Sequence, residues 1–232
     1  MIKQNYKIFI TIIFLMFFAF LNVNAQSFSP QFLISWQAQN YAPTWYQGKI
    51  FPVRGTPVEV NFEIVNNGKL VDLSDVKILW YINDELAKNE KDGLGIKTLK
   101  FNVSDYGGGE VEIRIVLPDY LEGELLDKII KIPIVMPELV INSPYPDNKV
   151  EIGESFFQAI PFFFNIEFID ILSIDWTANN QKSIGLAENP YLLNLNISSE
   201  TPKNTEINIS ALVKSILNNL EFANKSIKLN VK

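Results

Sequence analysis

A strand that carries a tryptophan near its end occurs twice in this chain. The first copy spans residues 75–84 and the second spans residues 171–180, and their tryptophans, Trp80 and Trp176, are 96 residues apart. Each tryptophan lies in an apolar run that ends in a pair suited to a tight turn, Asn-Asp in the first copy and Asn-Asn in the second. We therefore interpret each stretch as the central strand of a β-sandwich, and the chain as a duplicated domain.

The same spacing holds outside the tryptophan strands. Moving 96 residues along the chain carries Val111, Ile113, Ile115 and Leu117 onto Ile207, Ile209, Ala211 and Val213, which are all apolar. It also carries Leu99 onto Leu195 and Phe101 onto Ile197. Alternation of this kind predicts strands with one buried face. A period near 100 residues predicts two whole domains, because solenoid repeats are much shorter.

The chain opens with a predicted secretory signal. Lys3 and Lys7 precede an apolar run of 14 residues, 8–21, and Val23-Asn24-Ala25 supplies small residues suited to signal-peptidase cleavage before Gln26. A permanent anchor is the weaker alternative, because a membrane span needs roughly 20 apolar residues. With no cysteine after the run, a lipid-anchored lipoprotein is excluded. We expect a signal peptide over residues 1–25 and an exported protein.

Composition excludes several classes of function. Removal of residues 1–25 leaves 18 basic against 26 acidic residues, a net charge of −8, which argues against nucleic acid or anionic lipid as a partner. The chain has no histidine and no cysteine, so it lacks the usual nucleophile–base pairs, the usual zinc ligands and disulfides. We therefore expect no enzyme activity, no cofactor and no metal site. The acidic loop Asp119, Glu122, Glu124 and Asp127 lacks the ligand spacing of calcium loops, so a solvated loop is expected there.

The predicted domains are residues 30–135 and 137–232, joined at Met136-Pro137. Val58, Val60, Phe62 and Ile64 alternate with polar residues, which predicts a one-sided strand. Pro133 falls inside the last strand of the first domain, and a proline there predicts an edge or a bulge. Residues 211–223 allow a helical turn, but the repeat favours a strand and a loop.

Two aromatic stretches are candidate contact sites. Trp36, Tyr41, Trp45 and Tyr46 would form a platform for a sugar or an extended peptide, or else cap the open end of the first sandwich. The second stretch, residues 156–168, holds six phenylalanines. Because a strand shows alternate residues to opposite faces, adjacent Phe162, Phe163 and Phe164 are not expected to enter one core. Either another part of the chain covers the phenylalanines that one core cannot hold, or these residues form an exposed patch that marks a partner site.

The order of short alternating strands, the core tryptophan with its turn, and the glycine-rich bend at residues 107–109 resemble bacterial immunoglobulin-like and PKD-like domains. The resemblance covers residues 30–135 and 137–232. The segments 36–49 and 161–164 more loosely resemble uncharacterised exported two-domain immunoglobulin-like proteins of bacteria with small genomes. The resemblance to immunoglobulin-like and PKD-like domains implies an all-β fold of two tandem immunoglobulin-like antiparallel β-sandwiches. It implies no activity, since a fold alone confers none.

Together these observations predict an exported, non-catalytic structural or interaction module of the cell envelope or surface. The expected partner is an envelope or surface protein, and the alternative is an adhesin-like or carbohydrate-binding module that uses exposed aromatic rings. Contact with a membrane is expected only through an uncleaved signal segment. The sequence leaves open whether the protein is at the cell surface, periplasmic or extracellular.

Overall fold

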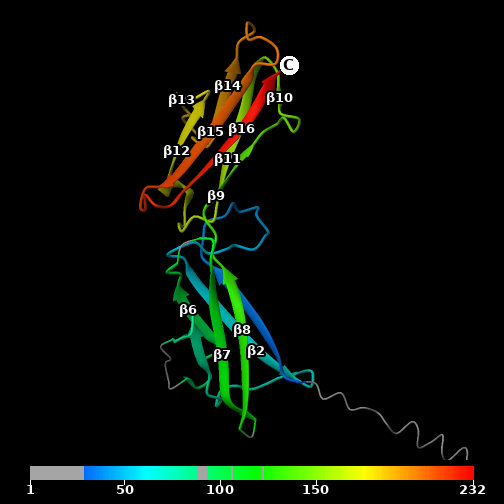
Figure 1. Cartoon of the computed structure of the whole chain (residues 1–232), viewed down its shortest axis with the longest axis vertical. Coiled ribbons are helices and arrows are strands. Elements are labelled where there is room, and N and C mark those ends of the chain that lie inside the picture. Colours follow the sequence, from blue (N-terminus) through cyan, green and yellow to red (C-terminus); the bar gives the residue numbers. More distant parts are fainter. Residues whose placement is uncertain (1–28, 88–92, 106, 122) are drawn as a thin grey trace, which may run out of the picture. The chain divides into compact units, whose positions relative to one another are not determined.

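The structure is a computed structural model that describes residues 29–87, 93–105, 107–121 and 123–232. The predicted signal peptide, with its cleavage before Gln26, lies outside the described residues. The described residues divide into two compact units, one with residues 29–33 and 64–71 and the other with the described residues of 34–63 and 72–232. We refer to strands β1 to β8 as the first sandwich and to β9 to β16 as the second (Figure 1). The domain boundary at residues 136–137 stays a prediction.

The first sandwich is built from two sheets. One has the order β1-β2-β3 with β6 also paired to β2, and the other has the order β5-β4-β7-β8. The strand bounds are β1 Gln31–Ala38, β2 Pro57–Asn66, β3 Lys69–Leu70, β4 Leu79–Ile82, β5 Glu85–Leu86, β6 Thr98–Asn102, β7 Glu110–Leu121 and β8 Glu124–Pro133. The alternating residues of β2 that the sequence predicts to be buried are buried, from Val58 to Ile64. That one-sided strand is thus confirmed.

The second sandwich repeats this plan. Its sheets have the orders β14-β11-β9 and β10-β16-β15-β12-β13. The strand bounds are β9 Glu138–Asn142, β10 Lys149–Val150, β11 Gly153–Phe162, β12 Leu172–Ala178, β13 Gln181–Ser183, β14 Leu192–Ile197, β15 Glu206–Ser215 and β16 Phe222–Val231. The pairing of β10 with β16 is parallel, and β11 with β14, β12 with β15 and β15 with β16 pair antiparallel. The structure confirms the predicted all-β, tandem immunoglobulin-like fold, and among the described residues no helix is long and apolar enough to cross a membrane.

The 96-residue repeat is confirmed at the level of strand register. Trp80 lies opposite Ile115, and Trp176 lies opposite Ala211. The indole N–H of Trp80 donates to the carbonyl of Ile96 at 2.8 Å, and that of Trp176 donates to the carbonyl of Pro190 at 2.9 Å. Both rings are almost fully buried. A large ring fixed by one hydrogen bond therefore holds each sandwich core in the same way.

The turn after each tryptophan strand is also duplicated. Asn83 and Asn179 adopt positive φ values of 48° and 50°, and each is followed by a second residue with φ of 65°. The Asn83 side-chain oxygen accepts from the main-chain N–H of Glu112, and the Asn179 oxygen accepts from that of Asn208. Asparagine suits this turn because it tolerates the left-handed conformation and bonds to main chain.

Two sequence expectations need correction. The sequence predicts the last strand of the second domain over residues 226–231, but β16 begins at Phe222, because β15 and β16 stay paired as far as Lys214 opposite Phe222. Residues 211–223 form strand ends and a loop, as the repeat favoured. The spacing of 96 fails between β6 and β14, where Leu99 and Leu193 are the buried equivalents, while Leu195 is half-buried. The connections before these strands differ in length, so one offset does not fit all strands.

Pro133 lies at the end of β8, and β8 is the outer strand of its sheet. The prediction of an edge position is thus confirmed. Proline is tolerated there because an edge residue whose N–H would face outward loses no ladder hydrogen bond.

Candidate functional site

The two aromatic stretches that the sequence singled out come together in the structure. The ring of Tyr46 lies 5.4 Å from that of Phe162 and 6.0 Å from that of Phe163, centroid to centroid. Trp45 lies edge-on to Phe162 at 6.1 Å. Tyr41 forms a main-chain bridge with Phe164, with hydrogen bonds of 2.8 Å from Tyr41 N to Phe164 O and from Phe163 N to Tyr41 O. Platform and phenylalanine strand are therefore one aromatic assembly.

Backbone geometry explains how three adjacent phenylalanines are all buried. Phe163 has a φ of 62°, a left-handed conformation that is uncommon for a bulky residue. Strand alternation breaks at this residue, just after β11 ends at Phe162. Phe164 then belongs to the core of the second sandwich, whereas Phe162 and Phe163 pack in a separate cluster with Val53. The expectation that the three do not share one core is confirmed, and other parts of the chain cover the surplus.

Asn40 holds this assembly through main-chain and side-chain hydrogen bonds. Its Nδ2 donates to the carbonyl of Phe51 at 2.6 Å and to that of Phe163 at 3.4 Å. Its Oδ1 accepts from the hydroxyl of Thr56 at 2.5 Å, and that hydroxyl in turn accepts from the N–H of Val53 at 3.0 Å. Both Asn40 and Thr56 are buried. A buried polar network with satisfied partners fixes one conformation, which suits a segment bearing a strained residue.

Trp36 is half-buried and has two neighbours of its own. Its ring lies 6.1 Å from that of Phe51, and the ammonium of Lys49 sits 3.7 Å from the centroid of the Trp36 ring. The same ammonium donates to the carbonyl of Trp36. Desolvation by burial lowers the pKa of Lys49. A cation already placed over this ring leaves less of the ring for a ligand.

The seven candidate residues differ in how much of each reaches solvent. Phe162, Phe163 and Phe164 are buried, and Trp36, Tyr41 and Tyr46 are half-buried. Trp45 is 63% exposed. Contact of any of the seven with a partner stays a prediction, and the Trp45 ring is the one that offers a broad free face.

A second surface was missed by sequence reasoning. Five large apolar side chains with exposed fractions between 43% and 75% lie on the β11–β12 loop, on the β15–β16 loop and at the first residue of β16. We call them the loop patch: Phe168, Ile216, Leu217, Leu220 and Phe222. The available signal was an apolar run interrupted by Asn218-Asn219 between two strands. The sequence analysis expected a strand and a loop there, but it did not consider that a tight loop cannot bury these side chains.

Hydrogen bonds tie the two loops to each other and close the second one. Ile216 N donates to Ile171 O at 3.0 Å, and Ile171 N donates to Phe168 O at 3.3 Å. Ser215 N donates to Glu221 O at 2.9 Å across the base of the β15–β16 loop. The loop patch is therefore displayed on a braced backbone, which limits the entropy cost of binding.

Glu221, the last residue of the β15–β16 loop, is buried. Its carboxylate accepts from the main-chain N–H of Asn165, the residue that follows the three phenylalanines. Desolvation raises the pKa of Glu221, and the hydrogen bond from Asn165 opposes part of that effect. The carboxylate thus links the β15–β16 loop to the end of the phenylalanine segment.

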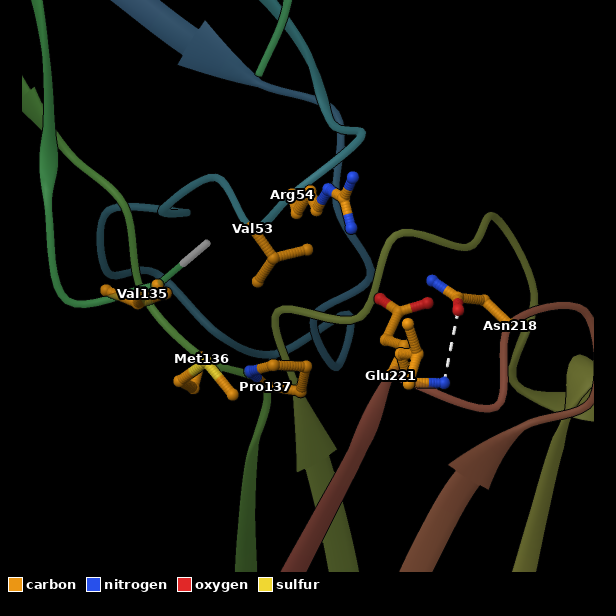
Figure 2. Close-up of a pocket in the computed structure, with 9 residues that line it drawn as sticks. Val53, Arg54, Val135, Met136, Pro137, Asn218 and Glu221 are labelled. Carbon is orange, nitrogen blue, oxygen red and sulfur yellow. Dashed lines mark hydrogen bonds between the residues drawn. The ribbon is translucent and has the colours of Figure 1, made fainter. Parts of the chain in front are cut away.

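A pocket lies beside Glu221 (Figure 2). Figure 2 shows the Glu221 and Asn218 side chains below and to the right of Arg54, with Met136 and Pro137 to the left of Glu221. It marks the bond from Leu220 N to the Asn218 side-chain oxygen, which measures 3.1 Å. The cavity volume of the pocket is about 40 Å³. A single water needs roughly 10–15 Å³ of such space, so the pocket holds a few waters and is too small for a sugar.

Among the residues that the structure describes, no group of three or more acidic side chains is placed to hold a metal ion. In the acidic loop, Glu122 lies outside the described residues. Asp127 there pairs with Arg114 at 2.6 Å. The expectations of no metal and no cofactor stay predictions.

No family model matches the chain, and no curated protein matches it. Among solved structures it is similar to an ICAM-5 D1–D4 ectodomain fragment, at 10% identity and a TM-score of 0.29, over 85% of this chain and 53% of that one. It is also similar to a surface glycan-binding protein, SGBP-B of the Bacteroides ovatus mixed-linkage glucan utilization locus, solved with a mixed-linkage heptasaccharide. That match has 11% identity and a TM-score of 0.26, over 88% of this chain and 47% of that one.

The chain thus spans about half the length of each of these structures. At such scores neither likeness carries an argument about function. The immunoglobulin-like fold is established by the strand order and register of this chain itself.

Proposed function

We propose that this protein is an exported, non-catalytic interaction module of the cell envelope or surface, and that its loop patch binds a protein partner. The observation that carries the proposal is the exposure of five large apolar side chains on two loops joined by a hydrogen bond and at the start of β16. Single exposed apolar residues are ordinary, but several of them on neighbouring segments are typical of an interaction surface.

The position of the loop patch in the fold supports a binding role. By strand order, the β11–β12 and β15–β16 loops correspond to the B–C and F–G loops of an immunoglobulin sandwich. In variable domains those loops belong to the antigen-binding end. Loops held on a rigid sandwich vary without cost to the core, and so they are frequent sites of recognition.

The chemistry of the loop patch favours protein over sugar. Ile216, Leu217 and Leu220 are aliphatic, and aliphatic side chains fill pockets in a protein partner. Sugars are more often met by flat aromatic rings with polar groups beside them. The predicted signal peptide at residues 1–25 supports export, and the absence of histidine and cysteine supports a non-catalytic role.

The test is cross-linking on intact cells, followed by affinity capture and mass spectrometry, on the wild type and on Leu217→Asp. We expect one dominant envelope protein with the wild type and at least a tenfold lower yield with the variant, because a charge would be desolvated in the interface. The matched control is Ile184→Asp, since Ile184 is 84% exposed and lies on the chain after β13, outside the loop patch. Equal capture by both variants and the wild type would overturn the proposal.

The exposed ring of Trp45 favours a second candidate, an adhesin-like or carbohydrate-binding module. In this case Trp45→Ala is expected to lose retention on cell-wall polysaccharide, while Phe156→Ala, an exposed aromatic on β11, retains it. Unchanged retention by folded Trp45→Ala would remove this candidate. Phe162, Phe163 and Phe164 are buried, so a change at any of these rings would alter folding as well as binding.

A further inference from the structure

The outer edge of β8 is open over most of its length. β8 is the last strand in the order β5-β4-β7-β8, and no described strand pairs with its far side. Ile134, just past β8, exchanges hydrogen bonds of 2.9 Å with the Gly108–Gly109 turn before β7, so its main chain faces β7. Because main-chain groups alternate in direction along an antiparallel strand, those of Leu125, Asp127, Ile129 and Lys131 face outward. An edge of this kind is a template for another strand.

The equivalent edge of the second sandwich is different. There β10 covers the end of β16, opposite Asn230 and Val231, and the uncovered positions carry Phe222 followed by the polar side chains Asn224, Ser226 and Lys228, so that Ser226 stands where β8 has Ile129. In the first sandwich a main-chain hydrogen bond from Val135 N to Pro52 O, at 3.0 Å, stands where the second sandwich has β10. The uncovered positions of β8 include Leu125 and Ile129, which are 61% and 45% exposed.

We propose that the outer edge of β8 pairs antiparallel with the same edge of a second copy of this chain, about a two-fold axis at Ile129. In this register Ile129 lies opposite Ile129 of the second copy, and Asp127 lies opposite Lys131 on both sides of the axis. About six main-chain hydrogen bonds form between Asp127 and Lys131. An interface that is the same on both copies closes at two subunits.

Charge complementarity selects this occupant and this register. Opposite charges directly across a strand pair are favourable and like charges are unfavourable. Sliding the pairing by two residues in one direction sets Lys128 against its own copy, and a further slide sets Asp127 against its own copy. Of these three registers, only the Ile129-centred one sets Asp127 against Lys131.

The charges are already positioned by ion pairs within the sheet. Asp127 bonds Arg114, and Lys131 bonds Glu110. Pairing therefore extends each ion pair into a row of alternating charge, Arg114 and Asp127 from one copy with Lys131 and Glu110 from the other. A carboxylate accepts several hydrogen bonds and an ammonium donates three, so the internal pairs do not saturate either group.

Pro133 and Lys131 are residue types that often prevent edge pairing. Here Pro133 stands at the end of β8, where the bond from Val135 to Pro52 takes over, so it limits the length of pairing and leaves its centre free. Lys131 faces an acid in the proposed register, so the side chain that would repel a random strand attracts this one.

A charge-swap experiment tests the proposal, with analytical ultracentrifugation of the exported chain purified from its cells. The wild type is expected to dimerise reversibly with concentration. Asp127→Lys and Lys131→Glu are each expected to dimerise at least about tenfold more weakly alone, because each sets like charges opposite one another. An equimolar mixture of the two variants is expected to recover association to near the wild-type level, because every pair is again opposite in sign.

The matched control is Lys228→Glu, which reverses the equivalent lysine on β16 and breaks its ion pair with Glu206 but leaves β8 unchanged. It is expected to associate like the wild type. Hydrogen exchange adds a local measurement, in which the amides of Asp127, Ile129 and Lys131 gain protection as concentration rises. A wild type that stays monomeric at every concentration, a mixture that fails to recover, or a dimer with unprotected β8 amides would each overturn the proposal.

Discussion

The two sandwiches share their interior and differ at their ends and edges. Each has a buried tryptophan whose indole donates to a loop carbonyl, and each closes the next turn with an asparagine that accepts from the adjacent strand. The loop patch belongs to the second sandwich and the open apolar edge of β8 to the first. The interior positions repeat because each sandwich packs its core around a buried tryptophan in the same way.

The difference indicates where each sandwich has room for a separate role. Core positions tolerate little change, since interiors are close-packed and a lost methylene is felt. Loops and strand edges accept new side chains at small cost in stability. The surfaces that differ between the two sandwiches are therefore the candidates for contact with other molecules. In the shared interior, equivalent mutations are expected to lower the stability of the two sandwiches by similar amounts.

The largest expected effect comes from the paired tryptophans. Trp80→Ala and Trp176→Ala are each expected to lower the free energy of unfolding by about 3–5 kcal/mol, since each leaves a large cavity and an unpaired carbonyl. Denaturant titration followed by circular dichroism measures both. Trp45→Ala serves as the exposed control and is expected to change stability by less than about 0.5 kcal/mol. A small loss at either buried tryptophan would break the equivalence of the two cores.

Next in size is Asn40, whose network holds the aromatic assembly. Asn40→Ala removes the acceptor of the Thr56 hydroxyl and the donor to the Phe51 carbonyl, and is expected to cost about 1–3 kcal/mol because buried groups are left unpaired. Thermal unfolding measures the change, with Asn219→Ala in an exposed loop as control. If Asn40→Ala melts like the wild type, the network does not hold the left-handed Phe163.

Sequence reasoning reached the fold because periodicity and turn chemistry are local. The alternation from Val58 to Ile64, the Asn-containing turns and the proline at the edge each report a constraint on a few neighbouring residues. The repeat related Trp80 to Trp176 and Ile115 to Ala211, and the structure pairs Trp80 with Ile115 and Trp176 with Ala211. The sequence thus identified equivalent strands, but their pairing required the structure.

The candidate site was harder to predict because it depends on contacts distant in sequence. Nothing local reveals that Tyr46 meets Phe162 or that Asn40 bonds the carbonyl of Phe163. The positive φ of Phe163 is imposed by those contacts and opposes the preference of the residue. The loop patch was missed for the converse reason, since apolar residues in a connection are usually buried by something, and only coordinates show that these are exposed.

Smaller and paired effects are expected at the duplicated turns. Asn83→Ala and Asn179→Ala are each expected to cost about 1–2 kcal/mol, from the left-handed backbone that alanine resists and from the lost hydrogen bond. Asn→Gly at the same positions keeps the turn conformation and loses only the bond, so it is expected to cost less. Denaturant midpoints of the four variants measure this. Unequal losses of stability in the two sandwiches would show that the two turns contribute differently to the free energy of unfolding.

The smallest expected effect is a pH dependence of stability that arises from Glu221 in the second sandwich. Glu221 has a raised pKa because it is buried, so its protonated form is favoured by folding and its charged form is disfavoured. Its contribution to stability is therefore full below the unfolded pKa and is lost as pH rises through the higher folded pKa. Glu221→Gln cannot ionise and keeps an oxygen for the N–H of Asn165, so this part of the pH dependence is expected to vanish. Melting temperatures across pH 4 to 8 measure it, with Glu200→Gln on the exposed surface as control. Parallel curves for Glu221→Gln and the wild type would mean that the carboxylate is hydrated in solution and does not link the loop to the phenylalanine segment.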